Sequence, residues 1–295
     1  MAILLFGATG MLGQAIAAEA GRRGRRVIGV SRQGADRQAD LSRLDALAGL
    51  LEGIAPDLVV NAAAITALDE CEHDPGMAYE VNARAVAVMA DCCASQAVPF
   101  VHVSTDHFFT GDGDRLHGET APVTLVNEYA RTKFAAEAFA RLAPGALVLR
   151  TNVTGMRGWR GRPTFAEWAF DALLRRTPLR LFEDFYTSTI DTRSFARALF
   201  DLVELGASGT FNLASRTVAS KRSFVQVLAR VLCVTLDWDE PASVGELGIR
   251  RAESLGLDVA NAERLLGYAL PDTIQVCRNL VSQWEQERCA ILLAS

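Results

Sequence analysis

A tyrosine and a lysine stand four residues apart in a segment that predicts a helix, NEYARTK at 127–133. Side chains at positions i and i+4 share one helix face, so we expect the Tyr129 hydroxyl and the Lys133 ammonium to lie together. A phenol with a pKa near 10 is a poor acid or base at neutral pH, and a nearby ammonium stabilises its phenolate. The pair indicates proton transfer; the alternative is a plain contact on the helix surface.

Lysine is rare in this chain. Of thirty Lys and Arg residues only Lys133 and Lys221 are lysines. Lysine differs from arginine in that its pKa shifts readily and its charge is compact. A retained lysine therefore indicates a position where arginine would not serve.

A hydroxyl follows the predicted strand 100–103, in the turn STD at 104–106. At the carboxyl end of a strand, the Thr105 hydroxyl is placed to bond a substrate carbonyl beside the phenol; alternatively it satisfies the turn backbone. His102, inside the strand, is interpreted as a packed histidine. Because His73, His107 and His117 lack metal-ligand spacing with carboxylates or cysteines, no metal site is predicted.

A glycine-rich turn, GATGMLG at 7–13, follows the first predicted strand and opens the first predicted helix. Glycines at this spacing allow a tight turn and a close approach of backbone to a pyrophosphate, which the helix N-terminus then stabilises. In its strand–turn–helix context the motif predicts nucleotide binding rather than a purely structural turn. The predicted cofactor contacts here are Gly7, Thr9, Gly10, Met11, Leu12 and Gly13.

The end of the second predicted strand determines which dinucleotide is preferred. An NAD site usually has an acidic residue there for the ribose 2′-OH, whereas this chain has Ser31 and Arg32, and no carboxylate until Asp36. Arginine suits a 2′-phosphate, so we expect NADP, with NADPH preferred over NADH; a solvated loop arginine is the alternative. The cluster RRGRR at 22–26 is interpreted as a solvated helix end and turn, not as a second phosphate site.

The elements that must position these residues alternate through the first half of the chain. Short apolar strands are predicted at 3–6, 27–30, 57–60, 100–103 and 146–149, with helices at 12–20, 41–51, 75–94 and 127–141. This rhythm predicts an α/β fold, a Rossmann-type doubly wound parallel sheet. We expect residues 1–150 to form the dinucleotide-binding domain. Residues 151–295 should supply the last sheet strand or strands, including 209–213, and a smaller, mostly helical substrate lobe at the carboxyl edge.

Composition narrows the classes of protein. The chain has 295 residues, 50% of them hydrophobic, and a net charge of −5, which disfavours nucleic-acid binding by general electrostatics. No apolar run approaches the roughly 18 residues of a membrane-spanning helix, and the apolar start at 1–6 predicts a strand, not a signal peptide. Six cysteines without a C-x-x-C pair indicate reduced thiols, so we expect a cytoplasmic protein.

Together these motifs resemble the extended short-chain dehydrogenase/reductases, and within them the dTDP-4-dehydrorhamnose reductase family. The similar stretches span nearly the whole chain: 61–69 (NAAAITALD), the helix around Asn82, 104–109, 127–137, 149–151, 186–189 and 265–271. The resemblance implies that Thr105, Tyr129 and Lys133 are the catalytic trio. It also implies a nucleotide-linked 4-keto-6-deoxy sugar as substrate, with no nucleic-acid or membrane partner and a homodimer as a possible assembly.

The resemblance implies further site residues. On the cofactor side they are Ser31, Arg32, Asp40, Leu41, Ala62, Ala63, Ala64, Asn82, Val103 and Ser104, in addition to Tyr129 and Lys133. On the substrate side they are Thr66, Leu68, Thr105, Asp106, His107, Asn152, Val153 and Ser188.

The chain departs from the family pattern on the substrate and dimer sides. His107 replaces the usual tyrosine, 152–154 (NVT) replaces an aromatic-containing segment, and Gln14 and Ala15 stand where some members have metal-binding glutamates. Two other functions stay open: an epimerase or dehydratase on the same scaffold, and a non-catalytic NADP-binding regulatory subunit. A dehydratase would usually have an acid pair beside Thr105, which this chain lacks. A regulatory subunit would not need to keep Thr105, Tyr129 and Lys133 together.

Overall fold

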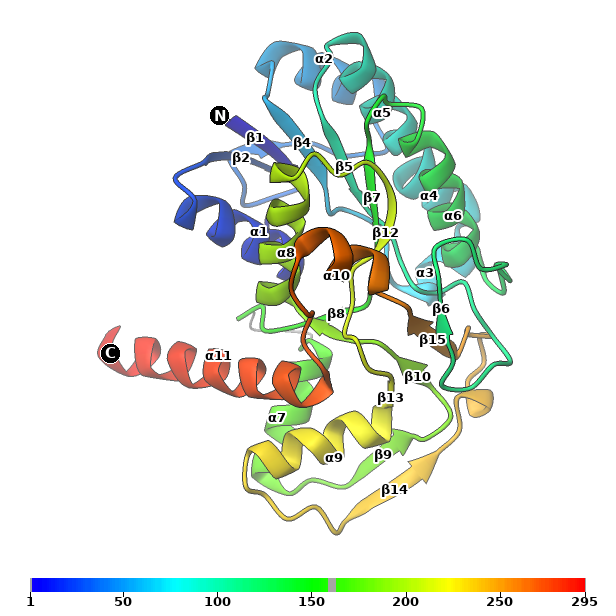
Figure 1. Cartoon of the computed structure of the whole chain (residues 1–295), viewed down its shortest axis with the longest axis vertical. Coiled ribbons are helices and arrows are strands. Elements are labelled where there is room, and N and C mark those ends of the chain that lie inside the picture. The colour runs from blue at the N-terminus through cyan, green and yellow to red at the C-terminus, as the bar shows by residue number, and fades with distance from the viewer. Residues whose placement is uncertain (1, 159–162, 295) are drawn as a thin grey trace.

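A seven-stranded, all-parallel sheet forms the centre of the protein in the computed structural model, which describes residues 2–158 and 163–294 (Figure 1). Its strand order, β12-β7-β5-β4-β1-β2-β3, reverses direction after β1, as in dinucleotide-binding folds. The strands are β1 (Ala2–Phe6), β2 (Arg26–Ser31), β3 (Arg37–Gln38), β4 (Leu58–Asn61), β5 (Phe100–Val103), β7 (Leu147–Arg150) and β12 (Gly209–Asn212). The predicted Rossmann-type sheet is confirmed.

Helices cover both faces of this sheet, because side chains of successive strand residues point to opposite sides. In β1, Ile3 and Leu5 join the core under α1, α8 and α10, whereas Leu4 and Phe6 join the core under α2, α5 and α6. These helices are α1 (Met11–Arg22), α2 (Leu44–Ile54), α5 (Ala85–Ser95), α6 (Glu128–Ala140), α8 (Thr192–Glu204) and α10 (Ala260–Leu266).

The helix predicted over 75–94 is helical throughout but not uniform. It runs as α4 (Pro75–Tyr79), a π-helical stretch (Glu80–Arg84) and α5, and the short α3 (Leu68–His73) precedes it. Pro75 stands at the first turn and the Asp74 side chain accepts the Met77 N–H, which fixes the start. The π-helical stretch contains Asn82, and such bulges are frequent at functional sites.

A second lobe lies beyond the carboxyl ends of the sheet strands (Figure 1). Its helices are α7 (Phe165–Arg175), α9 (Lys221–Val231) and α11 (Thr273–Ala294), with a short 3₁₀ helix at Val244–Glu246. Its strands are β6 (Leu116–His117), β8 (Val153–Thr154), β9 (Leu179–Phe182), β10 (Tyr186–Thr187), β11 (Ile190–Asp191), β13 (Ala219–Ser220), β14 (Asp239–Ala242) and β15 (Ser254–Leu257). Sequence reasoning missed α7, although a capping box of Thr164 and Glu167 starts it.

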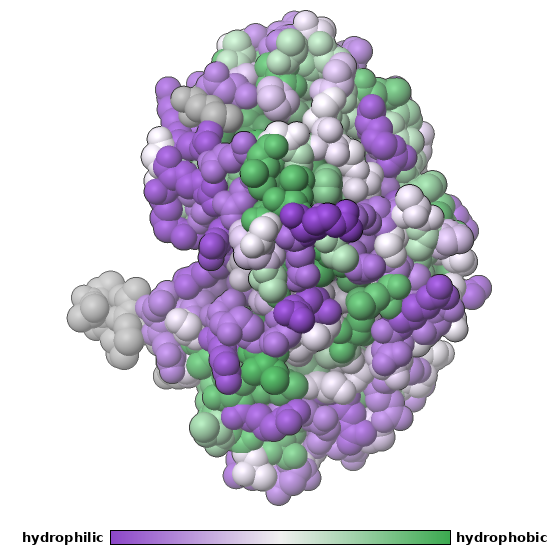
Figure 2. Space-filling view, viewed as in Figure 1, coloured by the Kyte–Doolittle hydropathy of each residue, from purple (hydrophilic) through white to green (hydrophobic). Residues whose placement is uncertain are grey.

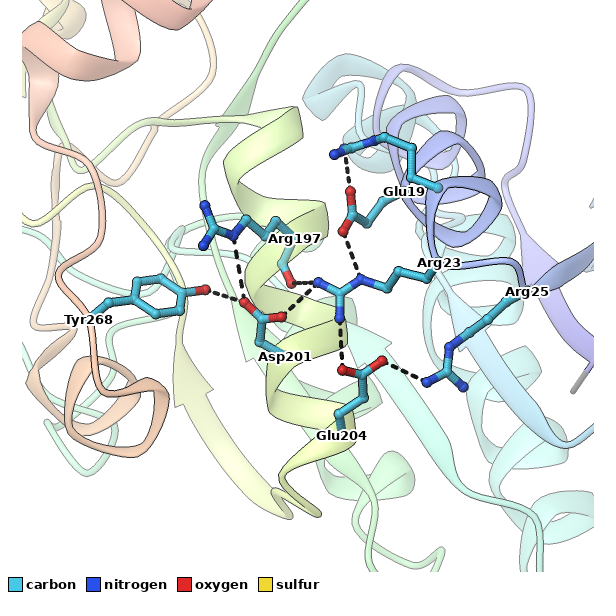
Figure 3. Close-up of polar contacts among 8 residues, drawn as sticks. Glu19, Arg23, Arg25, Arg197, Asp201, Glu204 and Tyr268 are labelled. Carbon is cyan, nitrogen blue, oxygen red and sulfur yellow. Dashed lines mark hydrogen bonds and ion pairs between the residues drawn. The ribbon is translucent and has the colours of Figure 1, made fainter.

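A network of ion pairs joins α1 to α8 and corrects the interpretation of the arginine cluster (Figure 3). The Arg23 guanidinium bonds Glu19 and Asp201, both at 2.7 Å, and Glu204 at 3.0 Å, while Arg25 bonds Glu204 at 2.6 Å. Only 18% of the Arg23 side chain is exposed, so this arginine is not solvated as expected. Its role is to tie two helices together.

Hydrophilic side chains are spread over the face shown in Figure 2, with hydrophobic ones in smaller patches between them. Within residues 2–158 and 163–294, no helix has the length and apolarity needed to cross a bilayer. A cavity of about 980 Å³ lies between α1, α8 and α11, lined by residues such as Met11, Arg197 and Gln283. The outline in Figure 2 narrows on the left, between the levels of α1 and α11 in Figure 1.

Candidate active site

The glycine turn between β1 and α1 has no room for larger residues. Gly7 has φ +80°, and a Cβ there would lie 2.9 Å from the backbone of Ala62. A Cβ on Gly13 would lie 2.1 Å from the Gly7 carbonyl oxygen. Helix α1 begins at Met11, and its N-cap residue Gly10 has no side chain to cap it, so the first N–H groups of the helix face the turn uncapped. Such a turn is suited to a pyrophosphate.

The end of β2 carries the residues predicted to bind the adenosine half of the cofactor. The Ser31 hydroxyl accepts a hydrogen bond from the Thr9 N–H at 3.2 Å, which joins β2 to the glycine turn. Arg32 is exposed, and Asp40 is exposed nearby. Two hydrogen bonds from Ser42 lower the pKa of Asp40, and the Arg32 charge adds to this effect. Leu41, by contrast, is buried in the core under α2, so its side chain packs rather than faces a ligand.

Tyr129 and Thr105 come together where α6 passes the end of β5. Asn127 caps α6, because its side chain accepts the Ala130 N–H at 2.9 Å and donates to the Arg250 carbonyl at 3.2 Å. Tyr129 is 8% exposed, and Thr105 is close enough to lower the pKa of its hydroxyl. Burial raises the pKa of Tyr129 to about 12, more than Thr105 lowers it. The net shift of the Tyr129 pKa is therefore upward, opposite to the expected lowering, and the phenol is protonated at neutral pH.

Lys133 is buried beneath the same strand end. Its Nζ donates to the Val103 carbonyl at 2.8 Å and lies 3.3 Å from His102 Nε2. Burial lowers the pKa of Lys133 to about 8, although Glu137 on the same helix opposes the shift. His102 Nδ1 in turn lies 3.2 Å from the Asn61 amide nitrogen. His102 is fully buried, as expected for a packed histidine, but it also contacts the predicted catalytic lysine.

Two predicted cofactor residues use their side chains to build the site. The Asn82 amide bonds the N–H and carbonyl of Ile65, at 2.7 and 3.0 Å, and the Thr132 hydroxyl at 3.1 Å. It thus ties the loop after β4 to α6. The Ser104 hydroxyl donates to Glu137 at 2.7 Å. Both side chains therefore position neighbouring segments.

Asp106, His107 and Asn152 lie together on the lobe side of Thr105. Asn152 donates to Asp106 at 2.8 Å and accepts from Thr189 at 2.9 Å, which links β5, β7 and the lobe. Burial raises the pKa of Asp106 to about 7. The His107 ring packs edge-on against Tyr129, with centroids 5.4 Å apart. Burial, with the charges of Lys221 and Arg251, lowers the pKa of His107 to about 4, so this imidazole is neutral.

The other predicted substrate residues divide into two groups. Leu68 packs with Tyr129 in a small buried cluster, Val153 is half-buried in β8, and Thr66 is exposed. The Ser188 hydroxyl accepts the Leu257 N–H at 3.1 Å, so it holds lobe strands together. Around Tyr129 the structure thus gathers Leu68 and the 105–107 turn but uses the Ser188 side chain elsewhere.

Lys221 was not predicted as a site residue, yet it lies among these groups. Its Nζ lies 4.7 Å from the Phe165 ring centroid and 5.6 Å from that of Phe185, whose ring also contacts His107. Burial lowers the pKa of Lys221 to about 8, and the charge of Asp106 opposes the shift. The signal in the sequence was the rarity of lysine: Lys133 lies at the end of β5, and the charge of Lys221 acts on Asp106 and His107, which follow Thr105.

The chain is similar to known reductases in its sequence. The family model described as RmlD substrate binding domain matches residues 1–248. A "probable low-salt glycan biosynthesis reductase" of Haloferax volcanii is 30% identical over 283 residues, covering 90% of this chain and 92% of that protein. A dTDP-4-dehydrorhamnose reductase of Burkholderia thailandensis is 31% identical over 306 residues, covering 96% and 100%.

A solved structure shows the same fold. The dTDP-4-dehydrorhamnose reductase from Bacillus anthracis, crystallised in complex with NADP, aligns with a TM-score of 0.84 at 18% identity, over 96% of this chain and 98% of that chain. The chain belongs to the dTDP-4-dehydrorhamnose reductase family of the extended short-chain dehydrogenase/reductases, and it is an NAD(P)-dependent oxidoreductase.

Proposed function

We propose that this protein is an NADPH-dependent reductase of a nucleotide-linked 4-keto-6-deoxy sugar. The observation that carries the proposal is the meeting of Thr105, Tyr129 and Lys133 at the end of β5, on the same sheet edge as the glycine turn. The turn suits a dinucleotide because it is tight enough that a Cβ at Gly7 or Gly13 would clash with neighbouring backbone, and because the first N–H groups of α1 have no side-chain cap. When bound there, NADPH would supply the hydride for the sugar ketone.

The residues of the chain would then manage the proton. As the ketone oxygen gains negative charge, Tyr129 donates its phenolic proton to it, and its raised pKa keeps that proton available at neutral pH. Thr105 bonds the same oxygen and holds it beside the phenol. Lys133 holds the nicotinamide ribose and, when charged, stabilises the phenolate that remains. We expect Asp106, His107, Asn152 and Lys221 to contact the sugar, because they gather on the lobe side of Thr105.

The preference for NADPH rests on Arg32. Its exposed guanidinium at the end of β2 has the planar geometry that binds a 2′-phosphate. Arg32→Asp should weaken NADPH binding at least several-fold while sparing NADH, as measured by fluorescence titration of both cofactors. Arg43→Asp, which also changes charge near Asp40, is the matched control. Equal affinities for the two cofactors, unchanged by Arg32→Asp, would remove Arg32 from the proposal.

The location and assembly of the protein stay proposals of the same kind. The described cysteines are free thiols, which is typical of a reducing compartment and supports the cytoplasm. A homodimer is proposed from the family alone, and sedimentation equilibrium of the purified protein would measure it.

Oxidation of NADPH in the presence of dTDP-4-keto-6-deoxy sugars, followed by other nucleotide-linked ketoses, tests the function. We expect turnover with at least one of them. Tight NADP binding without turnover of any would favour the regulatory-subunit alternative. Release of an epimerised or dehydrated sugar without net oxidation of NADPH would favour the epimerase or dehydratase alternative.

A further inference from the structure

His102 stands between the catalytic lysine and the loop after β4, and the proposed mechanism does not use it. It is fully buried in β5, directly beside Asn61 of β4 in the sheet register. Three polar contacts connect the loop to the lysine: Ala63 N–H to Asn61 Oδ1 at 3.0 Å, Asn61 Nδ2 to His102 Nδ1 at 3.2 Å, and His102 Nε2 to Lys133 Nζ at 3.3 Å. Because these three hydrogen bonds form one continuous series, the position of each proton constrains the positions of the others.

The direction of every hydrogen bond in this series follows from the first bond, which the Ala63 N–H donates. Because the Ala63 N–H is a donor, the Asn61 oxygen must face it, which turns the Asn61 NH₂ toward His102. His102 Nδ1 then accepts, and a neutral imidazole with an accepting Nδ1 carries its proton on Nε2. Burial keeps the pKa of His102 well below its ordinary value, so the ring is neutral. The Nε2–H therefore points at Lys133.

A neutral amine satisfies every contact at Lys133. It donates one hydrogen to the Val103 carbonyl, accepts the His102 Nε2–H with its lone pair, and keeps a second hydrogen free. An ammonium has no lone pair to accept that hydrogen. To accommodate it, His102 would have to move its proton to Nδ1 and the Asn61 amide would have to turn over, which breaks the bond to Ala63.

We propose that His102 is a positioning residue for Lys133, and that its Nε2–H couples the charge of this lysine to the loop at residues 62–64. Protonation of Lys133 and rearrangement of that loop are then one event. The consequence for turnover rests on the proposed role of Lys133 in catalysis, but the hydrogen-bond arrangement does not. Other ionisable groups around Lys133 are Glu137 and Tyr129 on its own helix, and Arg150 of β7, which is paired with Glu137.

Nuclear magnetic resonance tests the arrangement in the intact protein. The chain has four histidines, so [¹⁵N]histidine labelling gives few signals, and the long-range ¹H–¹⁵N pattern reports each tautomer. We expect His102 to be the Nε2–H tautomer above the Lys133 midpoint near pH 8, and to carry its proton on Nδ1 below that midpoint. A proton on Nδ1 well above the midpoint, or a tautomer that does not change as Lys133 titrates, would overturn the proposal without any substitution.

The two lysines give a second, independent measurement. With [ε-¹³C]lysine only Lys133 and Lys221 give signals, and Lys221→Arg assigns them. We expect Lys133 to titrate near pH 8, and His102→Leu to raise that midpoint by about one pH unit, the size expected for one lost hydrogen bond. Val101→Ala, which also removes buried volume from β5 but breaks none of these bonds, should leave the midpoint unchanged.

The outcomes separate this proposal from the proposed function. An unchanged Lys133 midpoint in His102→Leu, or an equal shift in Val101→Ala, contradicts the role of His102. If the wild type reduces no nucleotide-linked ketose, yet the His102 tautomer changes as Lys133 titrates and the Lys133 midpoint moves as expected in His102→Leu, the function is wrong and the coupling stands. If His102→Leu does not fold, the tautomer of the wild-type protein still decides.

Discussion

Charged side chains are buried or half-buried in two regions of this molecule, and their surroundings differ between the two regions. In the α1–α8 network, Arg23 is paired with Asp201 and two glutamates at hydrogen-bond distance (Figure 3). Around Tyr129, neither Lys133 nor Lys221 forms an ion pair with any residue that the structure describes, and burial displaces their pKa values toward neutrality. The first arrangement stabilises the fold, whereas the second costs stability and keeps groups ready to exchange protons.

The largest effect expected from this contrast is on catalysis. Tyr129→Phe removes the proton donor and should lower kcat by about 10²–10⁴-fold, the usual contribution of positioned proton transfer. The thermal midpoint and the NADPH dissociation constant should stay near wild-type values, because the ring and its packing remain. Tyr268→Phe, which removes the hydroxyl that bonds Asp201 in the network, is the matched control and should keep kcat. Equal activity of Tyr129→Phe and wild type would exclude Tyr129 as the donor.

In the α1–α8 network we expect a substitution to lower stability and to leave catalysis unchanged. Arg23→Met keeps the apolar stem but leaves Glu19 and Asp201 without their cation, so the free energy of unfolding should fall by about 2 kcal/mol. Urea unfolding measures this loss, while kcat should remain unchanged. Arg22→Met, at a largely exposed neighbour, should cost much less. A loss of activity in Arg23→Met without a loss of stability would contradict the division between the regions.

The two regions should also differ in the sign of their pH dependence. The pKa of Asp106 is raised to about 7, so the stability from this group is present below about pH 4 and is lost as pH rises through 7. The free energy of unfolding of Asp106→Asn should therefore rise relative to wild type between pH 4 and pH 7. The groups that face Asp106 are Thr105, His107, Asn152 and Lys221.

Asp201 in the network provides the opposite case. Its pKa is lowered by bonds from Tyr268 and Arg23, so its contribution is present above the unfolded pKa near 4 and is lost as pH falls. Asp201→Asn should lose stability at neutral pH, and the loss should shrink in acid. Unfolding by urea at several pH values compares the two variants, and slopes of the same sign would refute the contrast.

A smaller effect is expected for Lys221. Lys221→Met should raise KM for the nucleotide sugar by about tenfold, the loss of roughly one charge-assisted hydrogen bond, while sparing NADPH binding. Arg222→Met is the control, because it removes the neighbouring positive charge. Arg222 pairs with Asp239 at 2.8 Å rather than with any group around Tyr129, so this variant should leave KM unchanged. An unchanged KM in Lys221→Met would place this lysine outside the substrate site.

The sequence predicts the parallel sheet and the glycine turn well because both depend on local patterns. Apolar strands, intervening helices and three spaced glycines are each visible within a few residues, as is the i, i+4 spacing of Tyr129 and Lys133. What could not be predicted depends on contacts between distant segments. Lys221 is 116 positions from Thr105, Arg23 meets Asp201 across 178 positions, and the burial that raises the pKa of Tyr129 comes from the whole fold.

Transfer of deuterium from the cofactor tests the central claim most directly. NADPH carrying deuterium at C4 of the nicotinamide, on the face that the enzyme uses, is incubated with a dTDP-4-keto-6-deoxy sugar, and the sugar is analysed by mass spectrometry and NMR. The account predicts a product one mass unit heavier, with the deuterium at C4 of the sugar and a proton from solvent on the new hydroxyl. A protein that binds NADPH and the sugar together but leaves the deuterium on the cofactor would contradict it.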